Sequence, residues 1–141
     1  MLLVDTGPLV ATADVDDRHH RRCRELLETD PGPLVTTPLV IAESAYLIDR
    51  QLGPSAEAAL FRSITDGALT VEPLVHDDWL RIGDLVQEYA DLRLGGTDAS
   101  LIALAERLGA VRLATLNRRD FAVVRPRHVE ALELCPALPG A

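Results

Sequence analysis

The chain has 141 residues, 48% of them hydrophobic and 26% charged, which is the composition of a folded globular protein and not of a disordered one. Its formal net charge of −8 argues against a protein that coats nucleic acid by charge alone, although carboxylates neutralised by divalent cations would reverse that locally. All 14 basic residues are arginine, which excludes a Walker-type phosphate loop and lysine Schiff-base chemistry. No apolar run approaches the roughly 20 residues that cross a membrane. No secretory signal is recognisable either, so we expect one cytoplasmic domain without a membrane partner.

The sequence predicts short apolar strands and amphipathic helices that alternate along the chain. In its first half we expect a strand at 2–4, helices at 8–13 and 17–29, a strand at 34–36, and helices at 38–52 and 55–65. In its second half we expect an edge strand at 69–74, helices at 76–94 and 97–108, a strand at 111–115, a turn at 117–121 and a last strand at 129–134. This alternation predicts a three-layer α/β/α sandwich with a mostly parallel sheet, over residues 1–135, followed by a tail at 136–141.

The long helix predicted at 76–94 is expected to bury one apolar face. Its apolar and aromatic residues at helical spacing are Trp79, Ile82, Leu85, Val86 and Tyr89. We therefore expect these five side chains to pack inward.

The opening residues place a carboxylate directly after a buried strand. Leu2, Leu3 and Val4 form an unbroken apolar run, as in parallel strands covered on both faces. Asp5 follows where the ligand crevice of an open α/β sheet would lie, beyond the carboxyl end of the strand. The alternative is that Asp5 only caps the short helix predicted from Pro8.

Glu43 is the only charged side chain between Leu39 and Ile48. Its neighbours one helical turn away are apolar or aromatic, so we expect its carboxylate to face the interior or a cleft. An unpaired buried carboxylate is costly and should be paired, protonated or bound to a metal. A role in a site is favoured; the alternative is a salt bridge to a buried arginine or a hydrogen bond to a hydroxyl.

Two further acids belong to predicted elements in the second half of the chain. Asp98 opens a helix whose next residues are nearly all apolar, and a helix N-terminus keeps a carboxylate ionised, as a metal ligand must be. The alternative for Asp98 is a simple N-cap, although Thr97 is available for that. Asp120 follows the strand at 111–115 and is expected to add an oxygen ligand, with or without Asn117; the alternative is a solvated turn.

These acids are expected to share one site, because two follow buried strands and two line helices between those strands. Four oxygen ligands without a histidine or cysteine cluster suit Mg²⁺ or Mn²⁺ and not zinc. His19 and Cys23 are spaced i, i+4, but arginines flank them on a solvated face, which disfavours zinc there. Cys23 and Cys135 are expected to remain thiols.

Four segments of the chain resemble PIN-domain ribonucleases, and specifically the VapC toxins of bacterial toxin–antitoxin pairs: LLVDTGPLVA, TTPLVIAESAYLI, GGTDASLIALAERLG and RLATLNRRDF. The resemblance extends over nearly the whole chain. It implies a PIN-like fold and an endoribonuclease that depends on Mg²⁺ or Mn²⁺, with Asp5, Glu43 and Asp98 as the acidic core. It also implies supporting roles for Thr6 and Thr97.

The resemblance has one departure, because relatives often have Asp where this chain has Asn117. Either Asp120 serves as the fourth acid, with Asn117 in a supporting position, or a second metal is held weakly. Arg118 and Arg119 are expected to contact RNA phosphates; the alternative is a solvated turn. The family further implies a VapB-like antitoxin that fills a groove and blocks the site, and a homodimer.

Two other functions fit the same residues. One is a catalytically weak or inactive PIN-fold protein that binds RNA and an antitoxin without cutting. The other is a phosphotransfer or receiver domain, which also gathers acids at strand ends; the lack of lysine and of an Asp-x-Asp pair at Asp5 disfavours it. The sequence does not identify the RNA, which could be transfer, ribosomal or messenger RNA.

Overall fold

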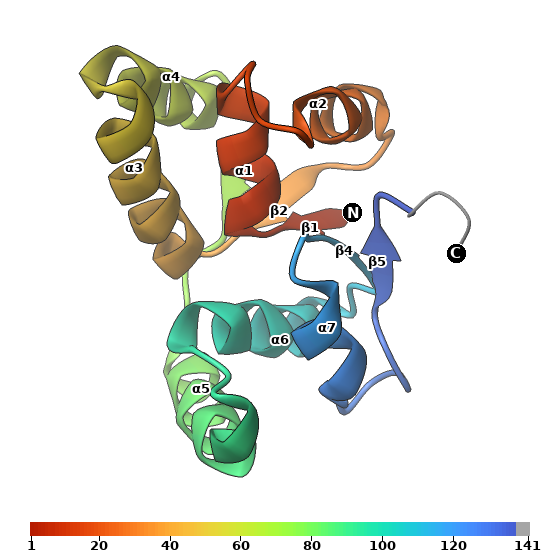
Figure 1. Cartoon of the computed structure of the whole chain (residues 1–141). Helices are drawn as coiled ribbons and strands as arrows, with labels where there is room; N and C mark the ends of the chain where they lie inside the picture. The colour runs from red at the N-terminus through yellow and green to blue at the C-terminus, as the bar shows by residue number, and fades with distance from the viewer. Residues whose placement is uncertain (138–141) are drawn as a thin grey trace.

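Five short strands form the centre of the molecule, and helices cover both faces of the sheet (Figure 1). The computed structural model describes residues 1–137, so the part of the predicted tail at 138–141 lies outside the described residues. The strands are β1 (Leu2–Val4), β2 (Leu34–Thr36), β3 (Thr70–Val71), β4 (Arg112–Ala114) and β5 (Glu133–Cys135). Within residues 1–137 no helix is long and apolar enough to span a membrane.

The helices fall into two groups on opposite sides of the sheet. They are α1 (Thr6–Ala13), α2 (His20–Thr29), α3 (Pro38–Leu52), α4 (Pro54–Thr65), α5 (His76–Glu88), the 3-10 helix η1 (Ala90–Leu92), α6 (Gly96–Leu108) and α7 (Arg118–Val123). Figure 1 shows α1 to α4 on one side and α5 to α7 on the other. The predicted three-layer α/β/α arrangement is therefore confirmed.

The order of the strands reverses at the middle of the sheet, where the chain begins to add strands on the other side of β1. The order is β3-β2-β1-β4-β5, and every pairing is parallel. The chain proceeds from β1 outward to β2 and β3, and then returns to add β4 on the other side of β1. The point between β1 and β4 is a topological switch point, and ligands of open α/β sheets bind beyond the carboxyl ends of the strands there.

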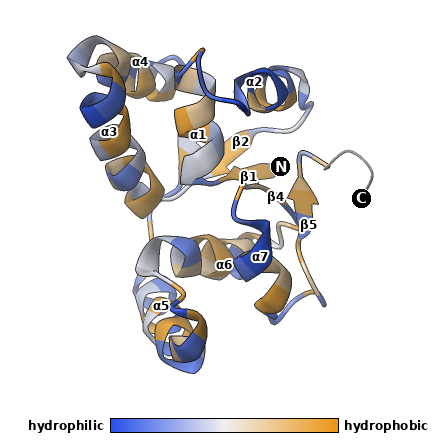
Figure 2. Ribbon diagram, viewed as in Figure 1, coloured by the Kyte–Doolittle hydropathy of each residue, from blue (hydrophilic) through white to orange (hydrophobic). Residues whose placement is uncertain are grey.

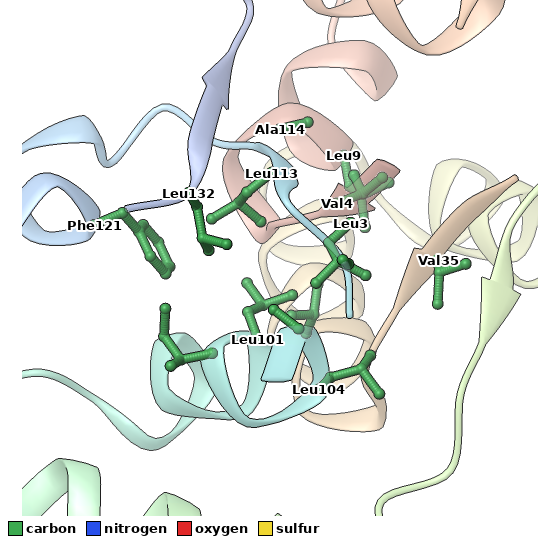
Figure 3. Close-up of a cluster of buried hydrophobic side chains, with 14 of the residues drawn as sticks. Leu3, Val4, Leu9, Val35, Leu101, Leu104, Leu113, Ala114, Phe121 and Leu132 are labelled. Carbon is green, nitrogen blue, oxygen red and sulfur yellow. The ribbon is translucent and has the colours of Figure 1, made fainter. Parts of the chain in front are cut away.

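The core forms where the apolar strands meet the buried faces of the helices. Leu2, Leu3 and Val4 are completely buried, which fits a central strand covered on both sides. Figure 3 shows Leu101 and Leu104 of α6 close to the side chains of the sheet, and Figure 2 shows β1 and β2 as hydrophobic. Each such leucine contributes about 1.5–3 kcal/mol when it leaves water. The rigid sheet fixes where the strand ends lie.

Two elements differ from the predictions near the C-terminus. Residues 118–123 form the helix α7 where we expected a turn, because Phe121 and Val124 are spaced by one helical turn and both become buried. The last strand is β5 at Glu133–Cys135, later than the predicted 129–134. Its register is set by pairing with β4, where Leu113 lies opposite Leu134.

The long helix predicted at 76–94 is shorter, and its buried face is rotated. It ends at Glu88, with Tyr89 as its C-cap, and η1 follows. Ile82 and Leu85 are buried as expected, but Trp79 and Val86 are 51% and 38% exposed, so that part of the prediction is wrong. The cause is Asp78, which is only 3% exposed and occupies the inward position through an ion pair with α6.

Candidate active site

Asp5 lies between the end of β1 and the start of α1, with only 5% of its surface exposed. Its Oδ1 accepts a 2.7 Å hydrogen bond from the Thr6 backbone N–H, so Asp5 does cap α1. Its Oδ2 accepts a second bond, also of 2.7 Å, from Thr115 Oγ1 just beyond β4. Asp5 is therefore held across the switch point and not only by its own helix.

Glu43 reaches the same strand ends from α3. Thr6 Oγ1 donates a 2.7 Å hydrogen bond to Glu43 Oε2, which joins α3 to the first residue of α1. Glu43 is an exposed residue, so its carboxylate does not face the interior, and its bond to Thr6 is the hydroxyl pairing that we gave as the alternative. The buried face of α3 contains Val40 and Ile48, whereas Tyr46 is 59% exposed, and Glu43 lies outside that buried face.

Asp98 approaches the switch point from the opposite helical layer. It lies in the first turn of α6. The N-cap of this helix is Gly95, which has no side chain that could cap it. Asn117 Nδ2 donates to Asp98 Oδ2 at 3.1 Å and to Asp120 Oδ2 at 3.0 Å. The Asn117 amide thus bridges two carboxylates, while its backbone N–H donates to Thr115 Oγ1 at 2.9 Å.

A buried pair of hydroxyl groups joins α3 to α6. Thr37 Oγ1 and Ser100 Oγ lie 2.8 Å apart, and both residues are completely buried. Thr37 also caps α3 by accepting a 3.2 Å hydrogen bond from the Val40 N–H. The starts of the two helices that carry Glu43 and Asp98 are therefore fixed relative to each other.

Two carboxylates of the site, those of Asp5 and Asp98, have raised pKa values. The pKa of Asp98 rises from 3.8 to about 7, first because of burial and then because of repulsion from Asp5 and Glu43; the Asn117 hydrogen bond opposes this shift. Burial also raises the pKa of Asp5, its two hydrogen bonds lower it, and repulsion from Glu43 raises it further. This part of the molecule thus holds more negative charge than its neighbours neutralise.

Hard oxygen donors with excess negative charge are the ligands that Mg²⁺ and Mn²⁺ prefer. Asp5, Glu43 and Asp98 are the residues that could hold such an ion, and the raised pKa of Asp98 shows that the set favours added positive charge. In residues 1–137 no three Asp, Glu, His or Cys side chains already lie close enough to hold an ion together. Binding therefore requires side chains to turn toward the ion, and exposed Glu43 has the freedom to do so.

The other residues that we predicted for the site take different places. Thr97 makes no side-chain hydrogen bond within the described chain; only its backbone carbonyl accepts one, from Ser100 Oγ at 2.6 Å. Arg118 Nη1 donates to the Pro136 carbonyl at 2.8 Å and so holds the segment after β5. Arg119 is exposed at the start of α7, in the hydrophilic stretch that Figure 2 shows there, and is the more accessible of the two arginines.

Thr115 is the residue of this site that the sequence prediction missed. It is completely buried, donates to Asp5 and accepts from the Asn117 backbone. The available signal was a hydroxyl residue at the end of an apolar strand. That signal gains meaning only once β4 is known to pair with β1.

Comparison with known proteins identifies the fold and the family. Residues 2–125 match the PIN domain family. Ribonuclease VapC26 of Mycobacterium tuberculosis is 31% identical over 125 residues, which cover 89% of this chain and 93% of that protein. The sequence match thus extends over most of both chains.

Solved structures of related toxins superpose on most of the chain. VapC20 of Mycobacterium tuberculosis, a sarcin-ricin loop cleaving toxin, has a TM-score of 0.82 at 20% identity and covers 92% of this chain and 99% of that chain. A toxin–antitoxin complex from Klebsiella pneumoniae has a TM-score of 0.67 at 22% identity, with 92% and 100% covered. VapBC2 from Rickettsia felis, bound to a DNA fragment from its promoter, has a TM-score of 0.64 at 17% identity, with 94% and 96% covered. These likenesses show the fold, and the sequence match shows the family: this chain belongs to the PIN domain family.

Proposed function

We propose that this protein is a divalent-metal-dependent endoribonuclease and the toxin of a VapBC-type toxin–antitoxin pair. The observation that carries the proposal is the approach of Asp5, Glu43 and Asp98, from three different elements, to the switch point between β1 and β4. The likeness to Ribonuclease VapC26 supports the reaction class. The likeness to the toxin VapC20 supports the biological role.

The proposed site assigns separate tasks to charged and neutral groups. Asp5, Glu43 and Asp98 hold the ion, and Asp120, joined to Asp98 through Asn117, adds a fourth carboxylate. A bound Mg²⁺ or Mn²⁺ supplies a Lewis acid and activates water for hydrolysis of an RNA phosphodiester. Hydroxyl and amide donors orient the carboxylates without neutralising them, so the negative charge stays available for the cation.

Cleavage of RNA in the presence of Mn²⁺ tests this assignment. We expect Asp98→Asn to lower the rate by about a hundredfold or more, because one charged ligand is lost. The matched control is Asp77→Asn, which removes an exposed carboxylate from α5 and should keep wild-type activity. Chelation with EDTA should abolish cleavage by wild type. Equal rates for wild type and Asp98→Asn would end the assignment.

An apolar cavity of about 300 Å³ supports the proposed antitoxin partner. Its lining includes Leu9, Leu27, Ile48 and Leu60. Such a surface suits an apolar segment of a VapB-like antitoxin, and the Klebsiella pneumoniae relative is a toxin–antitoxin complex. Ala59 lines this cavity and is exposed, so Ala59→Glu should retain nuclease activity and escape inhibition by the antitoxin. Unchanged inhibition would place the antitoxin elsewhere.

We also propose that the protein acts as a homodimer in the cytoplasm, where its RNA substrate is found. The exposed apolar side chains of Trp79 and Leu80 on α5 supply surface that a second copy would cover. Light scattering should give twice the chain mass for wild type and a smaller mass for Trp79→Glu. A monomeric wild type would contradict the dimer.

The alternative function is a PIN-fold protein that binds RNA and an antitoxin without cutting. One observation favours it: no three metal-binding side chains in residues 1–137 already converge. The family resemblance adds that Asn117 stands where relatives often have Asp. A titration with Mn²⁺, followed by isothermal calorimetry, separates the two functions. The nuclease should bind Mn²⁺ at a site that Asp98→Asn weakens, whereas the non-cutting protein should show no such site.

A further inference from the structure

A cavity of about 340 Å³ lies beside the acidic site and carries the opposite charge. Its lining contains four arginines and one histidine and neither Asp nor Glu. Two of its lining residues, Thr115 and Asn117, also hold Asp5 and Asp98, so the cavity and the acidic site share a wall. We call it the arginine cavity.

The four arginines of this cavity come from two distant segments and have no acidic partners in the part of the chain that the structure describes. Arg18 and Arg22 come from the turn before α2 and from α2 itself, whereas Arg118 and Arg119 come from α7. None of the four forms an ion pair with a carboxylate within residues 1–137. Arg18 donates instead to His19, at 3.0 Å. Cations gathered in this way repel one another, and an anion in the cavity relieves that repulsion.

The chemistry of the cavity fits phosphate. Guanidinium groups bind phosphate through two parallel hydrogen bonds and keep their charge at any physiological pH. The protein as a whole has a net charge of −8, and its acidic site repels a polyanion. Unpaired arginines next to that site offset the repulsion at the place where a nucleic acid would have to approach.

The wall that the arginine cavity shares with the acidic site favours RNA over an acidic protein segment as the ligand of the cavity. A ligand in the cavity that passes Thr115 and Asn117 continues over the carboxylates of the site. A segment rich in Asp and Glu would have to displace the site's own carboxylates from the same cation. An RNA strand has a phosphate at every nucleotide, so one phosphate occupies the acidic site with its cation while a neighbour occupies the cavity.

We propose that the arginine cavity binds an RNA phosphate that flanks the cleaved bond, chiefly through Arg18 and Arg119, because Arg22 Nη2 already donates to the Ala137 carbonyl. The proposal rests on the proposed function only in that the flanked bond is the one cleaved at the acidic site; the arginines themselves bind phosphate without the cation. It also assigns Arg118 a positioning task, because its Nη1 donates to the Pro136 carbonyl at the edge of the cavity.

Binding of a labelled 12-nucleotide single-stranded RNA, measured by fluorescence anisotropy in EDTA, tests the cavity without cleavage. We expect Arg18→Gln and Arg119→Gln each to weaken binding about tenfold, because a charge-assisted contact is lost. Each should also lower the salt dependence of log K by about 0.7 for single-stranded RNA. Arg119→Lys should keep the wild-type salt dependence. The matched control is Arg24→Gln, which removes an exposed arginine of α2 that pairs with Glu28 and should bind as wild type does.

The outcomes separate this proposal from the proposed function. Equal affinities for Arg18→Gln, Arg119→Gln and Arg24→Gln would overturn the phosphate site, even if wild type cleaves RNA with Mn²⁺. Wild type that binds RNA through these arginines but never cleaves it would keep the phosphate site and overturn the nuclease. An oligoglutamate peptide that competes as well as unlabelled RNA of equal charge would show that the cavity binds an acidic protein segment, and would also overturn the proposal.

Discussion

The interface between α5 and α6 and the switch point of the sheet handle charge in opposite ways. At the interface, Arg81 Nε donates to Glu106 Oε1 at 2.8 Å, and Arg107 Nε lies 3.0 Å from Asp78 Oδ2. At the switch point, carboxylates approach carboxylates, and arginines line a separate cavity. The two regions use the same side-chain types in different arrangements.

The difference shows which charges stabilise the fold and which await a ligand. The Glu106 carboxylate has a lowered pKa: burial alone would raise it, but the Arg81 hydrogen bond and other nearby donors outweigh that effect. The pKa of Asp98 is raised to about 7, because burial and nearby acids disfavour its charge. Groups with strongly perturbed pKa values gather at functional sites. Substitutions at the switch point should therefore affect activity, whereas substitutions at the interface between α5 and α6 should affect stability.

The largest expected effect is loss of activity in Asp5→Asn. Asparagine keeps the side-chain oxygen that caps α1, so the fold should persist while one metal-binding charge disappears. We expect RNA cleavage with Mn²⁺ to fall by about a hundredfold or more. The melting temperature in EDTA should stay equal or rise, because repulsion with Glu43 is removed. A stable variant with full activity would contradict the role of Asp5.

The converse change is Asp78→Asn, which should affect stability alone. Asp78 is 3% exposed, pairs with Arg107 and accepts the Val75 backbone N–H at 2.9 Å. Its loss should lower the free energy of unfolding by about 2 kcal/mol, measured by urea denaturation. Asp77→Asn, at the exposed neighbouring position, should change it little. Reduced cleavage by folded Asp78→Asn would show that the two regions are coupled.

The pH dependence of stability distinguishes the acidic site from the paired region. Between pH 3.8 and about 7 the folded chain keeps a proton on Asp98 that the unfolded chain has already released. The stability of the metal-free protein should therefore fall as pH rises through this window and level off above it. We expect a melting temperature several degrees lower at pH 8 than at pH 5.5. Mn²⁺ should restore it at pH 8.

Asp98→Asn provides the control for that measurement. It removes the titrating group, so its melting temperature should vary less with pH than that of wild type. An equally steep profile in this variant would assign the pH dependence to other groups.

The smallest expected effect belongs to Thr115→Val, which removes the hydroxyl that donates to Asp5 and accepts from the Asn117 N–H, with little change in volume. Without this hydrogen bond to Asp5 Oδ2, the pKa of Asp5 should rise further. RNA cleavage should drop a few-fold at neutral pH and recover at higher pH, where Asp5 ionises. Thr65→Val, at an exposed position on α4, should leave the pH profile unchanged. A uniform loss at every pH would indicate a packing defect instead.

Much of the fold could be predicted from local signals. Neighbouring residues alone predict the strand at Leu2–Val4 and the helix start at Thr37-Pro38, and both appear where expected. The acid after β1 was identifiable because a parallel strand must end at the ligand edge of the sheet. At these three places the adjacent residues alone decide the structure, and the sequence prediction was correct there.

The parts that could not be predicted depend on partners distant in the chain. Trp79 turns outward because Asp78 takes the inward place opposite Arg107, which lies on another helix. Glu43 is exposed because the buried face of α3 depends on which helices pack against it. Thr115 is recognisable only after β4 is placed beside β1. Periodicity within one element carries no information on these choices.

The hydrogen bond from Thr115 to Asp5 joins residues 110 positions apart in the chain. Asp5 is therefore synthesised well before the hydroxyl group that holds its carboxylate. A truncated or stalled product that ends before β4 lacks both this donor and the Asn117 bridge to Asp98. Interrupted translation should therefore yield fragments without nuclease activity, and activity should begin only once β4 and Asn117 have been synthesised.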